Sequence, residues 1–259
     1  MFIAASSQLW AQTLEEDLIQ YVKLDSQDAT NVRGRFDKVI AAIQADGSSS
    51  EMKMLKRTYR LVREEFLLKY RVHASLSETL ESGIYDCLTA TALYAATLER
   101  LHIRYDIMET NYHIFIMIYT TRGTVLLEAT DPVSGLVTGA DEIHDHLTSY
   151  HLQQPTLPSN RVLNNYSFEI FRSISNHSLI GLLYFNQSAR AFNDGDYLSS
   201  AQLLREAKSW YDTPRCESLG GLLQRAVEAS KMDEKARLEC LSLLKQQPTE
   251  NPAPTLFED

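Results

Sequence analysis

The fold is decided by the stretch GIYDCLTATALYAATLERLHIRYDIMETNYHIFIMIYTTRGTVLLEATDPVSG, residues 83–135. Within it, Cys87 opens a helical pattern, His113 stands in a strand-like run, and an acid ends the next strand at Glu128 or Asp131. The dipole and the free N–H groups of a helix N-terminus favour a thiolate. A histidine can accept the thiol proton, and a carboxylate can orient the imidazole. The stretch therefore contains the three residue types that covalent acyl chemistry uses.

A buried helix and an antiparallel sheet are predicted by the same stretch. Residues 87–101 are apolar on almost every side, which is typical of a central helix. Strand-like runs follow at 103–109, 112–120 and 124–130, with a hairpin at 121–123. The fold class is therefore α+β, with the helix that bears the cysteine packed on an antiparallel sheet. Asp86 is the expected N-cap of that helix.

The register of the second strand decides whether the histidine can reach the thiol. Alternation places His113, Phe115 and Met117 on one face of that strand. If this face meets the Cys87 helix, the imidazole reaches the sulfur; if it does not, His113 is a structural residue. Glu128 follows a buried apolar run, so its carboxylate needs a partner, and the imidazole would be one.

Helical patterns flank this core on its N-terminal side. They cover residues 13–23, where Thr13 and Glu16 fit a capping box, and residues 34–45 and 51–70. A turn region is expected at 73–83. Together with the central stretch, these elements form one predicted domain over 13–160.

Helices also dominate the C-terminal side, which we interpret as a separate unit over 165–248. A linker is expected at 151–160, and the character becomes helical from about residue 168. Helices are predicted over 178–210, with a break at 193–196, and over 216–246. The proline-rich acidic residues 249–259 are expected to form a tail without fixed structure.

The central stretch resembles the transglutaminase-like superfamily of papain-fold thiol enzymes. Cys87 matches the nucleophile of that family, His113 the strand histidine, and Glu128 the acid at the end of the next strand. The pair Asp131-Pro132 also resembles an Asp-Pro pair found in many members, so Asp131 is the alternative third residue. The resemblance implies a Cys-His-acid triad that acts on a protein or peptide substrate, as a peptide or amide hydrolase or as a transglutaminase.

Two further residues are candidates for the cleft beside such a triad. Tyr85, two residues before the cysteine, could line the cleft or donate a hydrogen bond to an oxyanion beside the backbone N–H of Cys87. Asn111, two residues before His113, is a candidate of the same kind. For Tyr85, a packing role is the alternative.

The C-terminal unit resembles a tetratricopeptide repeat. The residues that fall near the positions of one 34-residue helix pair are Leu183, Ser188, Phe192, Tyr197, Ser200, Leu204, Ala207 and Pro214. A stable solenoid needs about three repeats, so we expect this unit to pack against the thiol domain. The resemblance implies a protein partner for these helices.

Composition narrows the function classes. The net charge of −9 argues against a protein that binds nucleic acid through a basic face. No apolar run approaches the roughly 20 residues that a membrane helix needs. A cluster of acids and histidines lies at Asp141, Glu142, His144, Asp145, His146 and His151. On a helix His144 and His146 point about 200° apart, so we expect a solvated helix end and no metal, and no cofactor motif is present.

The remaining cysteines and the N-terminus bear on the cellular compartment. Cys216 and Cys240 could pair in an oxidising compartment, or both could be buried thiols. Residues 1–12 resemble the end of a secretory signal, or a flexible N-terminus. An exported protein, periplasmic or secreted, is slightly favoured over a cytoplasmic one.

The alternative to an enzyme is a non-catalytic module that binds a peptide in the cleft and a protein on its helices.

Overall fold

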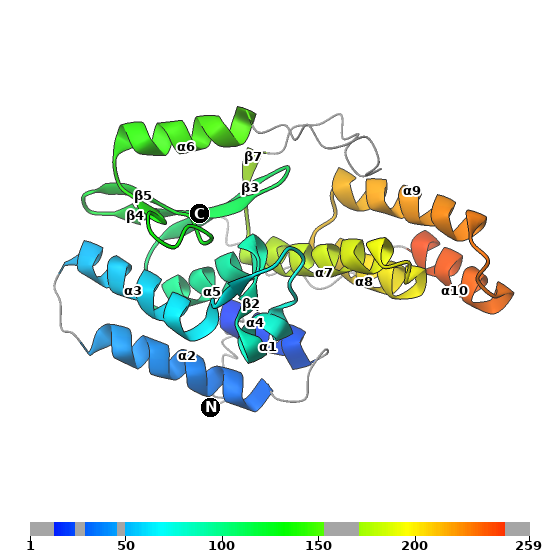
Figure 1. Ribbon diagram of the computed structural model, residues 1–259, viewed down its shortest axis with the longest axis horizontal. Coiled ribbons are helices and arrows are strands. Elements are labelled where there is room, and N and C mark those ends of the chain that lie inside the picture. The colour runs from blue at the N-terminus through cyan, green and yellow to red at the C-terminus, as the bar shows by residue number, and fades with distance from the viewer. Residues whose placement is uncertain (1–12, 24–28, 46–49, 153–170, 247–259) are drawn as a thin grey trace, which may run out of the picture.

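The computed structural model describes residues 13–23, 29–45, 50–152 and 171–246 (Figure 1). Its helices are α1 (Leu14–Lys23), α2 (Ala29–Gln44), α3 (Glu51–Phe66), α4 (Leu76–Ser82), α5 (Cys87–Arg100), α6 (Ala140–Leu152), α7 (Asn176–Asn193), α8 (Tyr197–Trp210), α9 (Pro214–Ala229) and α10 (Glu234–Lys245). Its strands are β1 (Lys69–Tyr70), β2 (Ile84–Tyr85), β3 (Tyr105–Thr110), β4 (Ile114–Thr120), β5 (Gly123–Leu127), β6 (Leu136–Val137) and β7 (Phe171–Ile174). The predicted α+β class is confirmed.

An antiparallel sheet with the strand order β6-β5-β4-β3-β7 forms the centre of the molecule. Helix α5 packs on one face of the sheet, and α6 covers the other face (Figure 1). Alternate residues of β4 separate these two sides, because Ile114, Ile116 and Ile118 belong to the core on the α5 side. Phe115 packs on the α6 side, and Met117 lies against the same cluster.

Helix α5 is buried from Leu88 to Leu98, as its sequence predicts. Asp86 is its N-cap and accepts a hydrogen bond from the backbone N–H of Thr89, while the Thr89 hydroxyl accepts one from the N–H of Asp86. This capping box satisfies free donors of the first turn. It also places the Cys87 side chain at the start of a rigid helix.

Between α3 and α5 the structure differs from the sequence-based expectation. The helix expected over 51–70 ends at Phe66, because the next residues form β1, which pairs in parallel with β2. The turn region at 73–83 contains α4, whose Ser75 and Glu78 form a capping box. Gly83 then ends α4 with a φ of 69°, a conformation that favours glycine.

The boundary between the two predicted units is also different. Residues 171–174 were expected to be helical, but they form β7, the edge strand that pairs with β3. The segment therefore completes the sheet of the first predicted domain. A unit beginning at residue 165 would divide this sheet.

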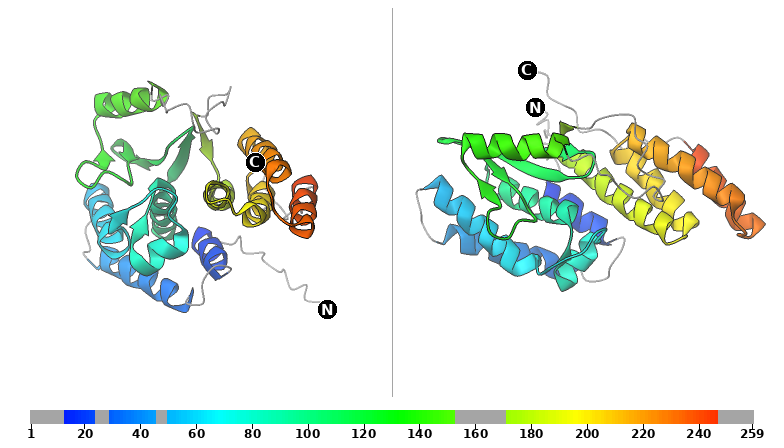
Figure 2. Two further views of the ribbon diagram at one scale, coloured as in Figure 1. Left: turned by 45° about the vertical axis from the view of Figure 1, so that its right-hand side comes forward. Right: turned by 45° about the horizontal axis from the view of Figure 1, so that its top comes forward.

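The C-terminal helices pack against the sheet domain, as we expected. Helix α7 contacts α1 and α5, and the rings of Tyr21 and Tyr184 lie 4.6 Å apart. In both views of Figure 2, α7–α10 lie to one side of the sheet, and the right-hand view shows them extending away from it. None of the helices in the described ranges is both long and apolar enough to cross a bilayer. The predicted signal remnant at 1–12, the tail at 249–259 and most of the linker at 151–160 lie outside the described residues.

Candidate active site

Cys87 lies in the first turn of α5, and the residue as a whole is half-buried. Burial, together with the negative charges of Asp86 and Glu128, raises the pKa of Cys87 to about 12. Backbone N–H groups at the helix start act in the opposite direction but do not outweigh these causes. The helix N-terminus thus favours the thiolate, as the sequence predicts, but burial and the two carboxylates outweigh it, and the resting sulfur carries its proton.

His113 is placed by the turn between β3 and β4, one residue before β4 begins. Asn111 and Tyr112 form the turn, and the backbone N–H of Thr110 donates to the carbonyl of His113 at 2.8 Å. The Thr110 hydroxyl oxygen accepts a hydrogen bond from the N–H of His113 at 2.9 Å. On the ring, Nε2 lies 2.5 Å from Oε2 of Glu128, which leaves Nδ1 as the nitrogen for a second partner.

Glu128 directly follows β5 and is buried, with 6% of the residue exposed. Its Oε1 accepts from the backbone N–H and the hydroxyl of Thr130, and its Oε2 accepts from the hydroxyl of Tyr150 at 2.7 Å. Burial alone would raise the pKa of Glu128, but the hydrogen bond and charge of His113, with the bonds from Thr130 and Tyr150, lower it to about 2. The carboxylate is therefore ionised at neutral pH.

Asp131, the alternative third residue, serves a different purpose. Its carboxylate accepts hydrogen bonds from the backbone N–H groups of Val133 and Ser134, each at 2.9 Å. It thereby closes the turn that leads to β6, and its carbonyl accepts from the hydroxyl of Tyr59. Of the two candidate acids, the structure pairs Glu128 with the histidine.

The two cleft candidates have different surroundings. Tyr85 lies in the hydrophobic core, 4% exposed, with its ring 5.8 Å from that of Tyr70. These contacts agree with the alternative expectation, in which Tyr85 packs in the core and does not line the cleft. Asn111 lines the cavity next to Cys87 and His113, and its carbonyl accepts a hydrogen bond from Arg215 at 3.0 Å.

Cys87 and His113 both line one cavity of about 290 Å³. The sequence predicts that His113 reaches the thiol only if the face of β4 that carries Phe115 and Met117 meets α5. That face packs under α6 instead. His113 reaches the cavity because it precedes the strand at the end of the sheet. Within the described residues, no hydrogen bond joins Cys87 to His113.

The C-terminal helices supply one wall of this cavity, which the sequence did not predict. Leu182, Phe185, Asn186 and Ala189 of α7 line it, as does Arg215 of α9. Tyr150 of α6 was also not predicted to belong to the site. Its hydroxyl donates a hydrogen bond to Glu128, which lies 22 positions earlier in the chain. No local pattern marks contacts of this kind, which arise only when distant elements pack together.

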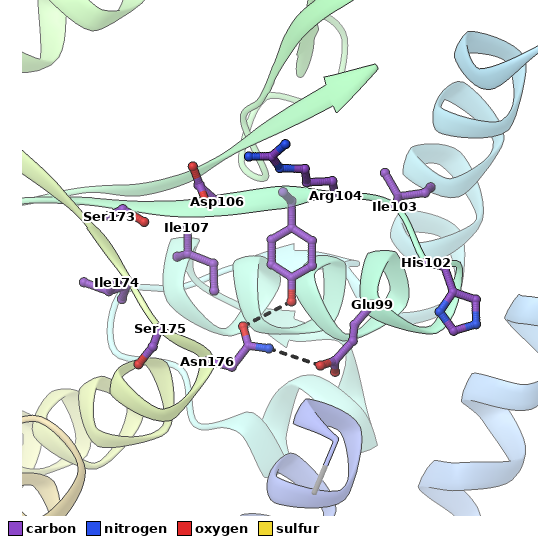
Figure 3. Close-up of a pocket in the computed structure, with 11 residues that line it drawn as sticks. Glu99, His102, Ile103, Arg104, Asp106, Ile107, Ser173, Ile174, Ser175 and Asn176 are labelled. Atoms are coloured by element: carbon purple, nitrogen blue, oxygen red, sulfur yellow. Dashed lines mark hydrogen bonds between the residues drawn. The ribbon is translucent and has the colours of Figure 1, made fainter. Parts of the chain in front are cut away.

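A second cavity, of about 640 Å³, lies at the opposite end of α5 from Cys87. The side chain of Asn176 donates to Glu99 beside this cavity (Figure 3), and the hydroxyl of Tyr105 donates to the amide oxygen of Asn176. Burial raises the pKa of Glu99, and the backbone N–H of Leu14 also donates to this carboxylate. The residues around this cavity include no cysteine, so the acyl chemistry discussed above does not belong there.

The structure also describes the two remaining cysteines and the acidic, histidine-rich cluster. Cys216 and Cys240 are free, buried thiols whose sulfurs donate to the carbonyls of Tyr211 and Tyr197. The acidic and histidine-rich cluster at 141–151 lies on α6. Among the described residues, no group of three or more His, Cys, Asp or Glu side chains could hold a metal ion.

Comparison of the chain with protein-family models, with curated proteins and with solved structures finds no match.

Proposed function

We propose that this protein is a cysteine-dependent acyl-transfer enzyme in which Cys87, His113 and Glu128 act as a triad. The observation that carries the proposal is the shared cavity, which Cys87 and His113 both line, together with the bond between the His113 ring and Glu128. The resemblance to the transglutaminase-like superfamily supports the same assignment. In that family the same residue types follow one another in the same order along the chain.

In the proposed reaction, His113 takes the proton from Cys87 as the sulfur attacks an amide or ester carbonyl. The imidazolium then protonates the leaving group, and Glu128 keeps the ring in one tautomer and stabilises its positive charge. Because the resting thiol is neutral, the proton moves during the attack. Water releases the acyl group in a hydrolase and an amine does so in a transglutaminase; we favour peptide or amide hydrolysis.

The side chains that line the cavity indicate which kind of acyl group the enzyme would accept. Tyr70, Val72, Leu182 and Phe185 contribute apolar surface to the cavity that Cys87 lines. We therefore propose a protein or peptide substrate with an apolar side chain at the reacting residue.

The test measures how fast iodoacetamide alkylates Cys87, followed by mass spectrometry of the peptide that contains it. The expected result is that His113→Ala slows alkylation at pH 7.5 by at least tenfold, because the thiol loses its base. In that variant the rate should rise about tenfold per pH unit from pH 6 to pH 9.5, since Asp86, Glu128 and the burial that raise the pKa of Cys87 in the wild type are not removed by the substitution. His144→Ala, on the exposed side of α6, is the matched control.

A catalytic cycle needs a second readout. N-acetylphenylalanine p-nitrophenyl ester is expected to give a burst of p-nitrophenol and an acylated Cys87 peptide, both absent from Cys87→Ala. Equal alkylation rates in the wild type and His113→Ala, with no acylated peptide, would overturn the proposal.

A non-catalytic binding module is the second candidate function. The raised pKa of Cys87, and the absence of a Cys87–His113 hydrogen bond among the described residues, favour it. In that case the cavity would hold an apolar peptide side chain, and α7–α10 would contact a protein partner. Unchanged alkylation in His113→Ala together with measurable peptide binding would select this function.

A further inference from the structure

A buried carboxylate beside the cavity connects the sheet to the C-terminal helices. Glu109, near the end of β3, is 1% exposed. Arg215 and Arg172 form ion pairs with it at 3.1 and 3.2 Å, and the hydroxyl of Tyr211 donates to it. A buried carboxylate is stable only when it is paired in this way. The ion pair with Arg215 therefore joins the end of β3 to α9, while the pair with Arg172 joins it to β7.

Arg215 makes a second set of contacts that reach the histidine. Its Nη2 donates to the carbonyl oxygens of Thr110 and Asn111, at 3.2 and 3.0 Å. These two residues lead into His113, whose backbone N–H donates to the Thr110 hydroxyl. One guanidinium thus holds both the strand end and the turn that carries the proposed base.

The C-terminal helices hold the other half of the site through Asn186 of α7. Its amide nitrogen donates to Oδ2 of Asp86 at 2.9 Å, and its amide oxygen lies 2.8 Å from Nδ1 of His73. Asp86 caps α5 next to Cys87. Helix α7 therefore contacts the residue that fixes the start of the thiol-bearing helix.

We propose that Arg215 and Asn186 are positioning residues, through which the C-terminal helices set the separation of the Cys87 thiol and the His113 imidazole. The proposal rests on the proposed function, because it assigns these residues to the same site. Arg215 acts on the turn that carries His113, and Asn186 acts on the N-cap of α5. Neither residue needs to touch the substrate for this role.

The experiment uses the full chain and the rate at which iodoacetamide alkylates Cys87. Arg215→Met is expected to lower this rate at least tenfold at pH 7.5. Arg215→Lys should recover part of it, because an ammonium can pair with Glu109 but cannot also hold both carbonyls in the geometry of a guanidinium. Arg205→Met is the matched control, since Arg205 pairs with Glu206 on a more exposed part of α8.

A comparison with His113→Ala separates positioning from a general loss of stability. If Arg215 acts through His113, the double variant His113→Ala/Arg215→Met should alkylate at the rate of His113→Ala alone. If Arg215 has only a structural role, the fold losses in alkylation rate of the two single variants should multiply in the double variant. Thermal unfolding followed by circular dichroism identifies the temperature at which every variant is folded, and the rates are compared there.

Asn186→Leu provides a second test that leaves the Glu109 ion pairs intact. We expect a loss of about three- to tenfold, against an unchanged rate in Gln187→Leu, the neighbouring position on α7. Wild-type rates in both Arg215→Met and Asn186→Leu, with a strong effect of His113→Ala, would overturn this inference and leave the proposed function standing. An ineffective His113→Ala would instead overturn the proposed function.

Discussion

At the residue scale, Glu128 is the most constrained group of the site. It is buried and accepts hydrogen bonds from Thr130 and Tyr150 besides its bond with the His113 ring. These partners favour the ionised carboxylate, which accepts a hydrogen bond from the His113 ring. The surroundings of Glu128 thus suit an acid that supports a base.

The lowered pKa of Glu128 makes the folded state sensitive to acid. The folded-state pKa is about 2 against an ordinary 4.5, so the stabilisation is fully present above about pH 4.5 and is lost as the pH falls towards 2. We expect the wild type to exceed Glu128→Gln in unfolding free energy at pH 7, with a difference that shrinks by roughly 3 kcal/mol by pH 2.

Urea unfolding at a series of pH values measures this difference. Glu64→Gln, at an exposed i,i+4 pair with Arg60, is the control and should change stability by less than about 0.5 kcal/mol. A difference between wild type and Glu128→Gln that stays constant with pH would contradict the assignment.

How well the sequence predicts the site depends on the distance between partners along the chain. Cys87, His113 and Glu128 could be identified because each stands at the end of a regular element within one short stretch. The preference for Glu128 over Asp131 agrees with the observed pairing to His113. The burial that raises the pKa of Cys87 was not predicted, because it depends on the packing of other elements. The same reason hid Arg215 and Asn186, which lie about 100 positions away.

At the element scale, caps and turns determine where helices end. The N-caps of α1 and α5 were readable from Thr13 and Asp86, and both observed helices begin directly after them. Helix α4 was missed because its seven residues are too few for a clear period, although Ser75 and Glu78 carry the capping pattern. Strand β7 was missed because its pairing partner, β3, lies far away in sequence.

Gly181 allows α7 to pack closely on the end of α8. A Cβ at this position would overlap the Cβ atoms of Trp210 and Tyr211. Gly181→Ala should therefore destabilise the protein by about 1–3 kcal/mol, even though alanine favours helices. Gly221→Ala in α9 is the matched control: its nearest neighbour would be Nη1 of Arg225 at 3.6 Å, and we expect a gain of up to about 1 kcal/mol.

Urea midpoints of the two glycine variants provide the comparison. Equal stabilisation by both alanines would show that α7 and α8 do not approach as closely as the structure indicates.

At the scale of the whole molecule, the sheet domain and the first C-terminal helices share a core. Leu179 and Leu183 of α7, together with Leu204 of α8, belong to the same buried cluster as the residues of α5. The sequence predicted two units because the periodicity changes after the sheet. It did not predict that the last strand and α7 close the first unit.

A shared core predicts one cooperative unfolding transition. Trp210 lies at the end of α8 and is the single tryptophan in a Trp10→Phe variant. We expect its fluorescence and the far-ultraviolet circular dichroism to change at the same guanidinium concentration. Two separate midpoints would indicate that the C-terminal helices unfold independently.

The pairing of β7 with β3 has a consequence for synthesis of the chain. The partners in this ladder, such as Ile107 and Ile174, are separated by most of the sheet and all of α6. While the ribosome is still translating the residues between them, the free edge of β3 has no strand to cover it. An uncovered edge is a template for pairing with other chains. Slowing translation before codon 171 would therefore lengthen the interval in which the nascent protein is prone to aggregate.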